Sequence, residues 1–182
     1  MSELLAGQLL LATPTLLDQN FKRTVVLVGV HSQQGAMGVV LNRPSEVTVG
    51  EAVPALESAV EPSELVYVGG PVQSTSVVVL AEFLDPAPAS VIVLGRIGFP
   101  APDSDLAQLS EATSRMRVYA GYAGWGEGQL EGEIADGYWI VQPAMPQDIF
   151  TEEPQALWSA VLSRKGGSYA LLARMPPDPS LN

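Results

Sequence analysis

The chain is a succession of short apolar runs separated by glycine, proline and polar residues. Runs of about four to eight residues that are rich in valine and leucine and bounded by turn residues are typical of buried β-strands. These runs predict strands over residues 7–12, 23–31, 37–41, 65–68, 77–81, 91–94, 117–122 and 138–141.

Two of these runs predict a β-hairpin. Residues 23–31 form its first strand, residues 37–41 form its second strand, and the polar segment 32–35 turns the chain between them. In this register His31 lies opposite Ala36, next to the turn. The hairpin therefore brings His31 to one end and the chain before residue 23 to the other.

Helical spacing of apolar residues marks a second kind of segment. It predicts helices over residues 103–115 and 154–165, the latter ending before two glycines. Residues 49–56 and 129–135 suit short helices, and residues 169–175 suit a second C-terminal helix or a terminal strand.

Strands and helices follow one another without a regular βαβ rhythm, which is typical of an α+β fold. No repeat, linker or shift of composition divides the chain, so we expect one domain over residues 1–175 and a solvated tail over residues 176–182. Residues 69–71, Gly-Gly-Pro, predict a tight turn between strands.

The segment 121–133 is the most unusual in the sequence, with five glycines and three carboxylates in thirteen residues. It predicts a glycine-rich loop, which Trp125 would anchor to the core. A phosphate loop needs Lys-Ser or Lys-Thr after its last glycine, whereas this chain has Gln129-Leu-Glu131 there. If the segment is helical, Glu127 and Glu131 share a face and could attract a cation. The sequence leaves open a structural loop and a ligand or metal loop that uses Trp125, Gln129 and Glu131.

A polar group is expected at the open end of the hairpin, where Asp18, Arg23, Asn42 and Arg43 can cluster. Eight strand residues at about 3.3 Å each place Arg23 about 26 Å from His31, so one site cannot hold both sets. One interpretation is an internal Asp–Arg pair with an asparagine bonded to loop backbone. The other is a small anion pocket lined by Asn42 and Arg43, because guanidinium groups suit carboxylates and phosphates.

His31 is the only histidine, and the chain has no cysteine. Metal sites with two or three histidines, thiolate metal sites and cysteine nucleophiles are therefore excluded within one chain. No Gly-x-Ser-x-Gly motif accompanies His31, so a turn-stabilising hydrogen bond is its expected role.

The charge of the chain disfavours nucleic acid as a direct partner. Nine basic side chains stand against 20 acidic ones, which gives a net charge of −11. Binding to nucleic acid rests on Lys and Arg neutralising phosphates, and the sequence has no long basic run. The apolar N-terminal stretch contains Glu3 and is interrupted by Pro14, so neither a signal peptide nor a membrane span is expected. We expect a cytoplasmic protein.

Several motifs together resemble the YqgE/AlgH family, and the resemblance runs from about residue 7 to residue 165. They are Gly7-Gln-Leu-Leu-Leu-Ala-Thr-Pro14, Asp18 to Val25, His31, Gly35 to Pro44, Gly69-Gly-Pro-Val72 and Gly121 to Glu131. The resemblance implies a single-domain bacterial protein in which a bifurcated mixed sheet curls into a pseudo-barrel flanked by short helices. Members are often labelled transcriptional regulators, and the family offers no catalytic residue or cofactor to carry over.

From the sequence we expect a non-catalytic regulatory or accessory protein that acts through a protein partner or a small ligand, with no cofactor. The alternative is a metal-assisted hydrolase or transferase that uses carboxylates of the segment 121–133. The oligomeric state and the identity of any ligand do not follow from the sequence.

Overall fold

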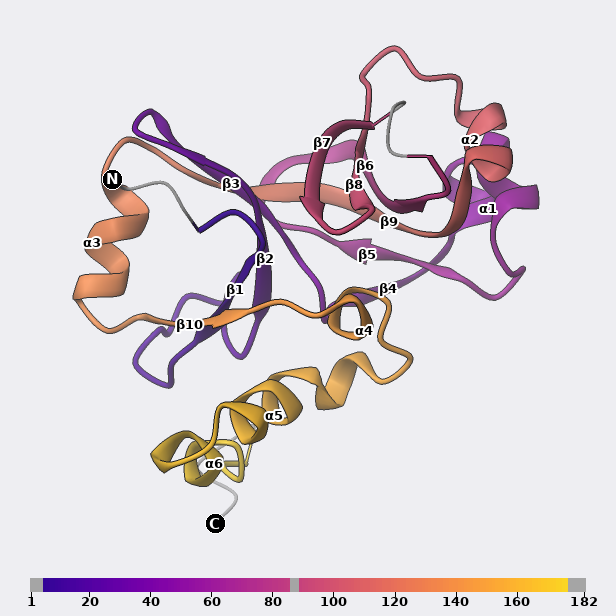
Figure 1. The fold of residues 1–182 in the computed structure, drawn as a ribbon. Coiled ribbons are helices and arrows are strands. Elements are labelled where there is room, and N and C mark those ends of the chain that lie inside the picture. The colour runs from indigo at the N-terminus through magenta and orange to yellow at the C-terminus, as the bar shows by residue number, and fades with distance from the viewer. Residues whose placement is uncertain (1–4, 86–88, 177–182) are drawn as a thin grey trace.

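A computed structural model describes residues 5–85 and 89–176 of the chain, which fold around one large sheet that does not close into a barrel (Figure 1). Eight strands follow the order β10-β1-β2-β3-β9-β6-β8-β7, and β5 joins β4 to β9. The strands are β1 (Gln8–Ala12), β2 (Val25–Ser32), β3 (Gly35–Val40), β4 (Pro44–Thr48), β5 (Leu65–Val68), β6 (Val72–Phe83), β7 (Ala89–Leu94), β8 (Ile97–Pro100), β9 (Thr113–Trp125) and β10 (Trp139–Pro143).

The longest strand, β9, is where the sheet forks. Its residues 113–122 pair with antiparallel β6. Tyr119 and Ala120 also pair with β5, which is parallel, and residues 123–125 pair with antiparallel β3. Because β5 and β6 meet the same residues of β9, they occupy its two opposite edges. The expected bifurcated sheet is thus present, with β9 common to both branches.

The segment 69–71 joins β5 to β6 by crossing β9, and the tight turn predicted there is wrong. The two strands flank β9 and do not pair with each other, so the chain must pass over the backbone of β9. A Cβ added at Gly69 would lie 2.3 Å from the carbonyl oxygen of Gly121, and one at Gly70 would lie 2.2 Å from the backbone of Tyr122. Glycine is required here because two backbones approach each other closely.

Both faces of the β1–β2–β3 region are buried. Side chains alternate between faces along a strand, so Leu9 and Leu11 join the cluster under the C-terminal helices while Leu10 and Ala12 join the cluster on the other face. All four are at most 1% exposed. Two-sided burial explains why these strands appear in the sequence as continuous apolar runs.

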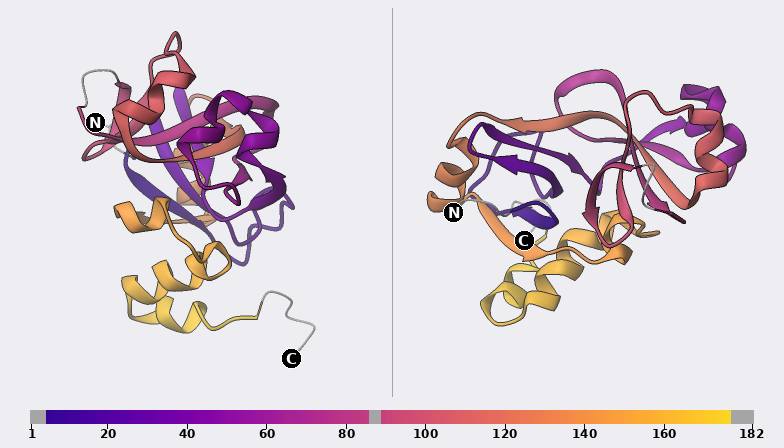
Figure 2. Two further views of the ribbon diagram at one scale, coloured as in Figure 1. Left: turned by 90° about the vertical axis from the view of Figure 1, so that its right-hand side faces the viewer. Right: turned by 45° about the horizontal axis from the view of Figure 1, so that its top comes forward.

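Helices cover the ends and one side of the sheet (Figures 1 and 2). One end carries α3, the other end carries α1 and α2, and α5 and α6 lie side by side next to β1 and β10. The helices are α1 (Val49–Ala52), the 3-10 helix η1 (Pro54–Ala59), α2 (Leu106–Ala112), α3 (Gln129–Ala135), α4 (Pro146–Ile149), α5 (Pro154–Lys165) and α6 (Ser168–Leu172).

The predicted hairpin is confirmed, including the pairing of His31 with Ala36. The helices predicted over residues 129–135 and 154–165 have those bounds, and the C-terminal segment contains a helix, α6. The helix predicted over residues 103–115 is shorter, since the chain after Ala112 enters β9.

The glycine-rich loop expected between the strand ending at residue 122 and the helix starting at residue 129 is shorter than predicted. Residues 123–125 continue β9, and only residues 126–128 link it to α3. Strands β4 and β8 and helix α4 were not predicted. Of the expected tail, Pro176 is described and residues 177–182 lie outside the described part of the chain. No helix in the described residues is long and apolar enough to span a membrane.

Candidate functional site

The hairpin tip and α3 are joined by a contact between His31 and Glu131. Pairing of β3 with the end of β9 brings the start of α3 beside the hairpin, and His31 Nε2 bonds to Glu131 Oε1. The backbone N–H of Leu5 donates to Nδ1 at 3.4 Å, so the ring proton belongs on Nε2, which donates to the carboxylate. The hydrogen bond from His31 and one from backbone lower the pKa of Glu131. The His31 side chain is 2% exposed, so its end of the contact is shielded from solvent.

Glu133, two residues after Glu131 in α3, binds two tryptophans. Its Oε2 atom accepts hydrogen bonds from the indole N–H of Trp125 at 2.8 Å and from that of Trp139 at 2.9 Å. The amide of Gln129 donates to Oε1 at 3.3 Å. Phe21 packs edge-on against Trp139, with ring centroids 5.7 Å apart, and the two indoles are 6.2 Å apart. A single carboxylate therefore satisfies the polar atoms of an aromatic cluster under α3.

The three carboxylates of the segment 121–133 therefore do not converge on one site. Glu131 meets His31, Glu133 meets the indoles, and Glu127 precedes α3. Within the described residues no three His, Cys, Asp or Glu side chains are grouped so as to hold a metal ion. Gln129 closes the loop, since its Oε1 accepts from the backbone N–H of Gly126 at 3.0 Å.

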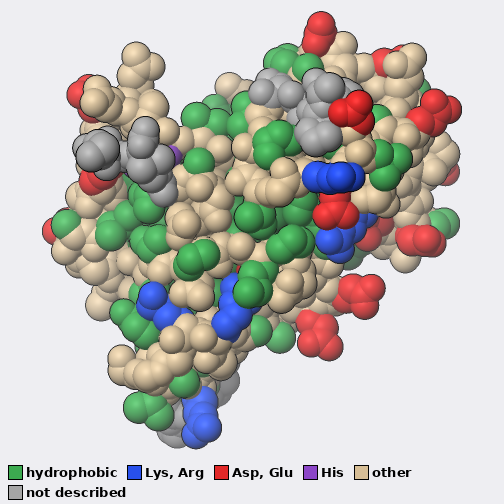
Figure 3. Space-filling model, in the orientation of Figure 1, with side chains coloured by type: hydrophobic (Ala, Val, Ile, Leu, Met, Phe, Trp, Pro, Cys, Tyr) green, Lys and Arg blue, Asp and Glu red, His purple; other side chains and the backbone are tan. Residues whose placement is uncertain are grey.

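An open groove of about 540 Å³ lies between the β2–β3 hairpin and the place where Val72 of β6 pairs with Tyr122 of β9. We call it the hairpin groove. In Figure 3 this side of the molecule is hollowed between the two branches, with hydrophobic side chains exposed there. Val30 and Ser32, the neighbours of His31, both contribute to the groove. Its lining is Val30, Ser32, Gln34, Gly35, Ala36, Met37, Val72, Tyr122, Gly124 and Trp125.

At the open end of the hairpin, Asn42 and Arg43 bind backbone. Asn42 accepts from the N–H of Val25 at 3.0 Å and donates to the carbonyl of Arg23 at 2.9 Å. Arg43 donates to the carbonyl of Asn20, and its Nη2 donates to those of Gln19 and Lys22, both at 3.0 Å. The two side chains thus fasten the segment that enters β2.

Asp18 and Arg23 do not form an ion pair with each other in the structure. Asp18 accepts from the backbone N–H of Asn20 at 2.8 Å, as in a loop-closing turn. Burial lowers the pKa of Arg43, and the charge of Asp18 partly opposes that shift. Arg23 points away from this group, because its Nη1 donates to the carbonyl of Met175 at 3.0 Å and its guanidinium lies over the ring of Trp158. The four residues therefore do not form one cluster. Asp18, Asn42 and Arg43 bind backbone around the segment that enters β2, whereas the guanidinium of Arg23 lies against Trp158 and Met175.

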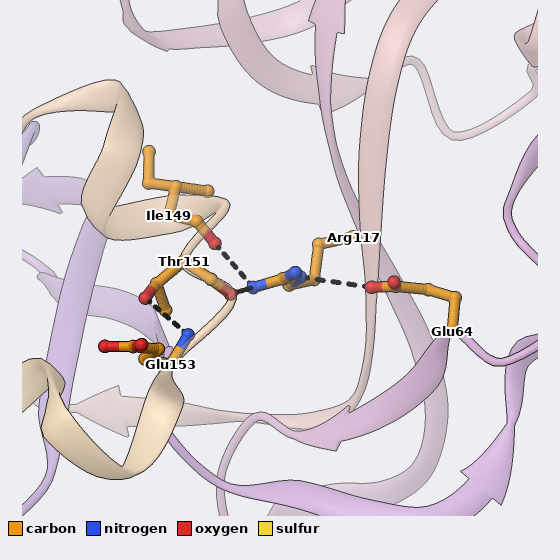
Figure 4. Close-up of polar contacts among 5 residues, drawn as sticks. All are labelled: Glu64, Arg117, Ile149, Thr151 and Glu153. Atoms are coloured by element: carbon orange, nitrogen blue, oxygen red, sulfur yellow. Dashed lines mark hydrogen bonds and ion pairs between the residues drawn. The ribbon is translucent and has the colours of Figure 1, made fainter.

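A separate polar cluster surrounds Arg117 on β9 (Figure 4). Its Nη1 donates to the carbonyls of Ile149 and Thr151, at 3.2 and 2.7 Å, and its Nε lies 3.3 Å from Glu64. The guanidinium also lies 4.6 Å from the ring centroid of Tyr67. Arg117 thereby joins the sheet to the turn that leads into α5.

The sequence analysis counted Glu133 among the carboxylates of the segment 121–133, but it did not single out Trp139, Arg117 or Glu64. Glu133 lies in the segment 121–133, eight residues after Trp125. Its contact with Trp125 could be predicted only once the start of α3 was known. The Arg117–Glu64 contact spans 53 residues and connects different elements, so no local pattern reveals it.

Comparison with known proteins finds a large set of relatives of this chain. The family model described as AlgH-like matches residues 9–170. A UPF0301 protein of Streptomyces coelicolor is 40% identical, over 98% of this chain and 95% of its own length. A UPF0301 protein of Thermobifida fusca is 41% identical, over 98% and 96%.

Two solved structures share the fold. A crystal structure of a Corynebacterium diphtheriae protein superposes with a TM-score of 0.85 at 30% identity, covering 95% of this chain and 93% of the other. The solution structure of the AlgH protein from Pseudomonas aeruginosa gives a TM-score of 0.73 at 32% identity, covering 94% of each chain.

Proposed function

We propose that this chain, which belongs to the AlgH-like family, is a regulatory or accessory protein without a catalytic centre of its own, and that it acts by binding a segment of a protein partner in the hairpin groove. The regulator label used for the family then describes an indirect effect, exerted through the partner. The acidic chain, with a net charge of −11, favours a protein over the phosphate backbone of duplex DNA.

The observation that carries the proposal is the uncovered apolar lining of the groove. Val30, on β2, is 44% exposed although it extends a strand whose first five residues are buried. Met37, Val72 and Tyr122 line the same hollow from three other strands. Apolar side chains that gather in one exposed hollow mark interaction surfaces, whereas single exposed ones need no explanation.

Charge next to the groove defines the kind of segment that fits. The described lining has no charged residue, but two acidic residues follow its last member, Trp125, in the chain: Glu127 two positions later and Glu131 six positions later. An extended partner segment would bury its apolar side chains in the groove, and a flanking Lys or Arg of that segment would pair with Glu127 or Glu131. Complementary charge of this kind sets the orientation and association rate of a partner.

The experiment uses a photo-cross-linking amino acid at Met37 in cells, with the same residue at Leu171 as control. Leu171, on α6, is 69% exposed and lies outside the groove. The partner captured from Met37 alone is purified, and its affinity is measured for the unaltered chain, for Val30→Glu and for Leu171→Glu. We expect Val30→Glu to weaken binding about tenfold or more, because it places a carboxylate in an apolar contact, and Leu171→Glu to leave it unchanged.

Equal affinity of the two glutamate variants for the purified partner would refute the groove as the binding surface. A salt-dependent complex with duplex DNA near physiological ionic strength would refute indirect action, since phosphate contacts produce that salt dependence.

A further inference from the structure

A second cavity, of about 170 Å³, lies at the opposite end of β2 from the hairpin groove. We call it the Trp158 cavity. It lies between the end of β1, the loop that enters β2, and helix α5, and it shares no described lining residue with the groove. Its lining is Ala12, Thr13, Pro14, Leu16, Leu17, Lys22, Arg23, Trp158, Met175 and Pro176.

The walls of the Trp158 cavity are mainly apolar. Trp158 is 2% exposed, and its indole N–H donates to the carbonyl of Ala12 at 2.9 Å, so its orientation is fixed. Leu17 is 74% exposed and is the exposed apolar part of the lining. An apolar cavity of about 150 Å³ is known to accept benzene, so this one has room for an apolar body of about that size.

Two cations and no carboxylate are found among the described lining residues, in a chain with 20 carboxylates and nine basic side chains. Lys22 forms no side-chain hydrogen bond or ion pair within the described residues. Arg23 is bound through Nη1 to the carbonyl of Met175 and stacks 4.1 Å from the ring centroid of Trp158. Burial lowers the pKa of Arg23, and an anion in the cavity would offset the cost of that desolvated charge.

The backbone of Arg23 is itself unusual, with φ of 55° in the left-handed region. Residues other than glycine seldom adopt it, and such strain gathers where a side chain must be aimed in one direction. Here the strained turn separates the guanidinium from the Arg43 group and directs it over Trp158.

We propose that the Trp158 cavity binds a small organic carboxylate, with an apolar ring or short chain against Trp158 and Leu17 and the carboxylate against Arg23 and Lys22. Two cations beside an apolar wall recognise that combination, whereas a neutral apolar molecule leaves the cations unpaired and an inorganic anion leaves the wall unfilled.

The test measures binding of benzoate and hexanoate to the full chain by calorimetry, with NMR of the tryptophan indole N–H groups as a site-specific readout. The chain has three tryptophans. We expect the Trp158 signal to shift and those of Trp125 and Trp139 to stay in place, because only Trp158 lines the cavity and the other two indoles lie under α3. Benzyl alcohol and inorganic phosphate serve as the neutral and the polar comparison.

Variants separate charge from folding. Arg23→Gln is expected to weaken benzoate binding about tenfold or more, because a charge-assisted hydrogen bond is lost. Lys22→Gln is expected to weaken it about twofold to fivefold, since Lys22 is exposed. Arg174→Gln, which removes an exposed cation outside the cavity, is the matched control and leaves binding unchanged.

Three outcomes overturn the proposal. They are the lack of a saturable Trp158 shift with either carboxylate, binding of benzyl alcohol or phosphate as tight as that of benzoate, and unchanged affinity in the Lys22→Gln/Arg23→Gln double variant. The Lys22→Gln result stands even if Arg23→Gln unfolds the chain, because the Lys22 side chain forms no hydrogen bond or ion pair within the described residues.

Discussion

His31 and Glu131 are separated by 100 residues in the sequence, and their side chains share one hydrogen bond. The contact closes the space between the tip of the β2–β3 hairpin and the first turn of α3. Neither side chain lines the hairpin groove, although Val30 and Ser32 on both sides of His31 do, because side chains alternate between the two faces of a strand. The only histidine of the chain therefore holds the hairpin tip against α3.

This pair makes stability depend on pH in the acidic range. The hydrogen bond from His31 lowers the pKa of Glu131 in the folded state, below the value of about 4.3 of an unfolded glutamate. The carboxylate thus contributes stability above about pH 4.3, and the contribution is lost as pH falls through the lower folded pKa. The effect is small, because the Glu131 side chain is 41% exposed.

The measurement is the free energy of unfolding between about pH 3 and pH 7 for the unaltered chain and for Glu131→Gln. The variant should lose part of the pH dependence and converge with the unaltered chain at the acidic end. Glu127→Gln, an exposed glutamate two residues before α3, is the control. An identical pH profile for all three proteins would contradict the assigned role of the pair.

Glu133 has a larger structural role than Glu131. Glu133→Ala removes the acceptor of two indole N–H groups and should cost about 2–4 kcal/mol, the penalty of two unsatisfied donors. Glu133→Gln keeps one carbonyl oxygen and should cost less. Urea unfolding followed by tryptophan fluorescence measures both, with Glu127→Ala as the control. A loss below about 0.5 kcal/mol in Glu133→Ala would show that water replaces the carboxylate.

The sequence predicted the elements that local chemistry determines. Apolar runs, prolines and glycines placed most strands, the helix over residues 154–165 and the pairing of His31 with Ala36. It also identified the hairpin and the segment 121–133 as the two notable parts of the chain. What it did not show is that the two meet, because that depends on the pairing of β3 with β9 across about 90 residues, as in Ala36 with Trp125.

The glycines illustrate the same limit. A dense glycine segment fits a loop, a ligand site or a close backbone crossing equally well. Only the topology shows that Gly69 and Gly121 lie where the segment joining β5 to β6 crosses β9. Likewise the sequence grouped Arg23 with Arg43, but the left-handed backbone at Arg23 directs the two guanidinium groups to different places.

Arg43→Ala should reduce stability by about 1–2 kcal/mol, because three loop carbonyls lose a charged donor. Thermal unfolding of the variant measures the loss, and hydrogen exchange should locate it in residues 18–24. Arg96→Ala, an exposed arginine with one bond to the carbonyl of Leu84, is the comparison and should lose less. Unchanged stability of Arg43→Ala would instead support the anion pocket that the sequence suggested.

The crossing of the segment 69–71 over β9 predicts that alanine substitution lowers stability at Gly69 and raises it at Gly132. Gly69→Ala places a Cβ 2.3 Å from the carbonyl oxygen of Gly121, and backbone must move, so we expect a loss of about 2–4 kcal/mol. Gly132→Ala lies in α3 with no atom within 4 Å of the added Cβ and should gain about 0.5–1 kcal/mol. Chemical unfolding of both variants tests this, and similar effects of the two substitutions would contradict the crossing.

We expect Arg117 to hold the segment that leads into α5 against the sheet. Arg117→Met leaves the carbonyls of Ile149 and Thr151 without their donor and Glu64 without its cation. Because Arg117 is 7% exposed, we expect a loss of about 3 kcal/mol and faster hydrogen exchange in α5. Glu64→Gln should cost less, since it leaves both carbonyl bonds in place. Arg174→Met, at an exposed arginine, is the control, and a loss no greater than in that control would show that α5 is held by its apolar face alone.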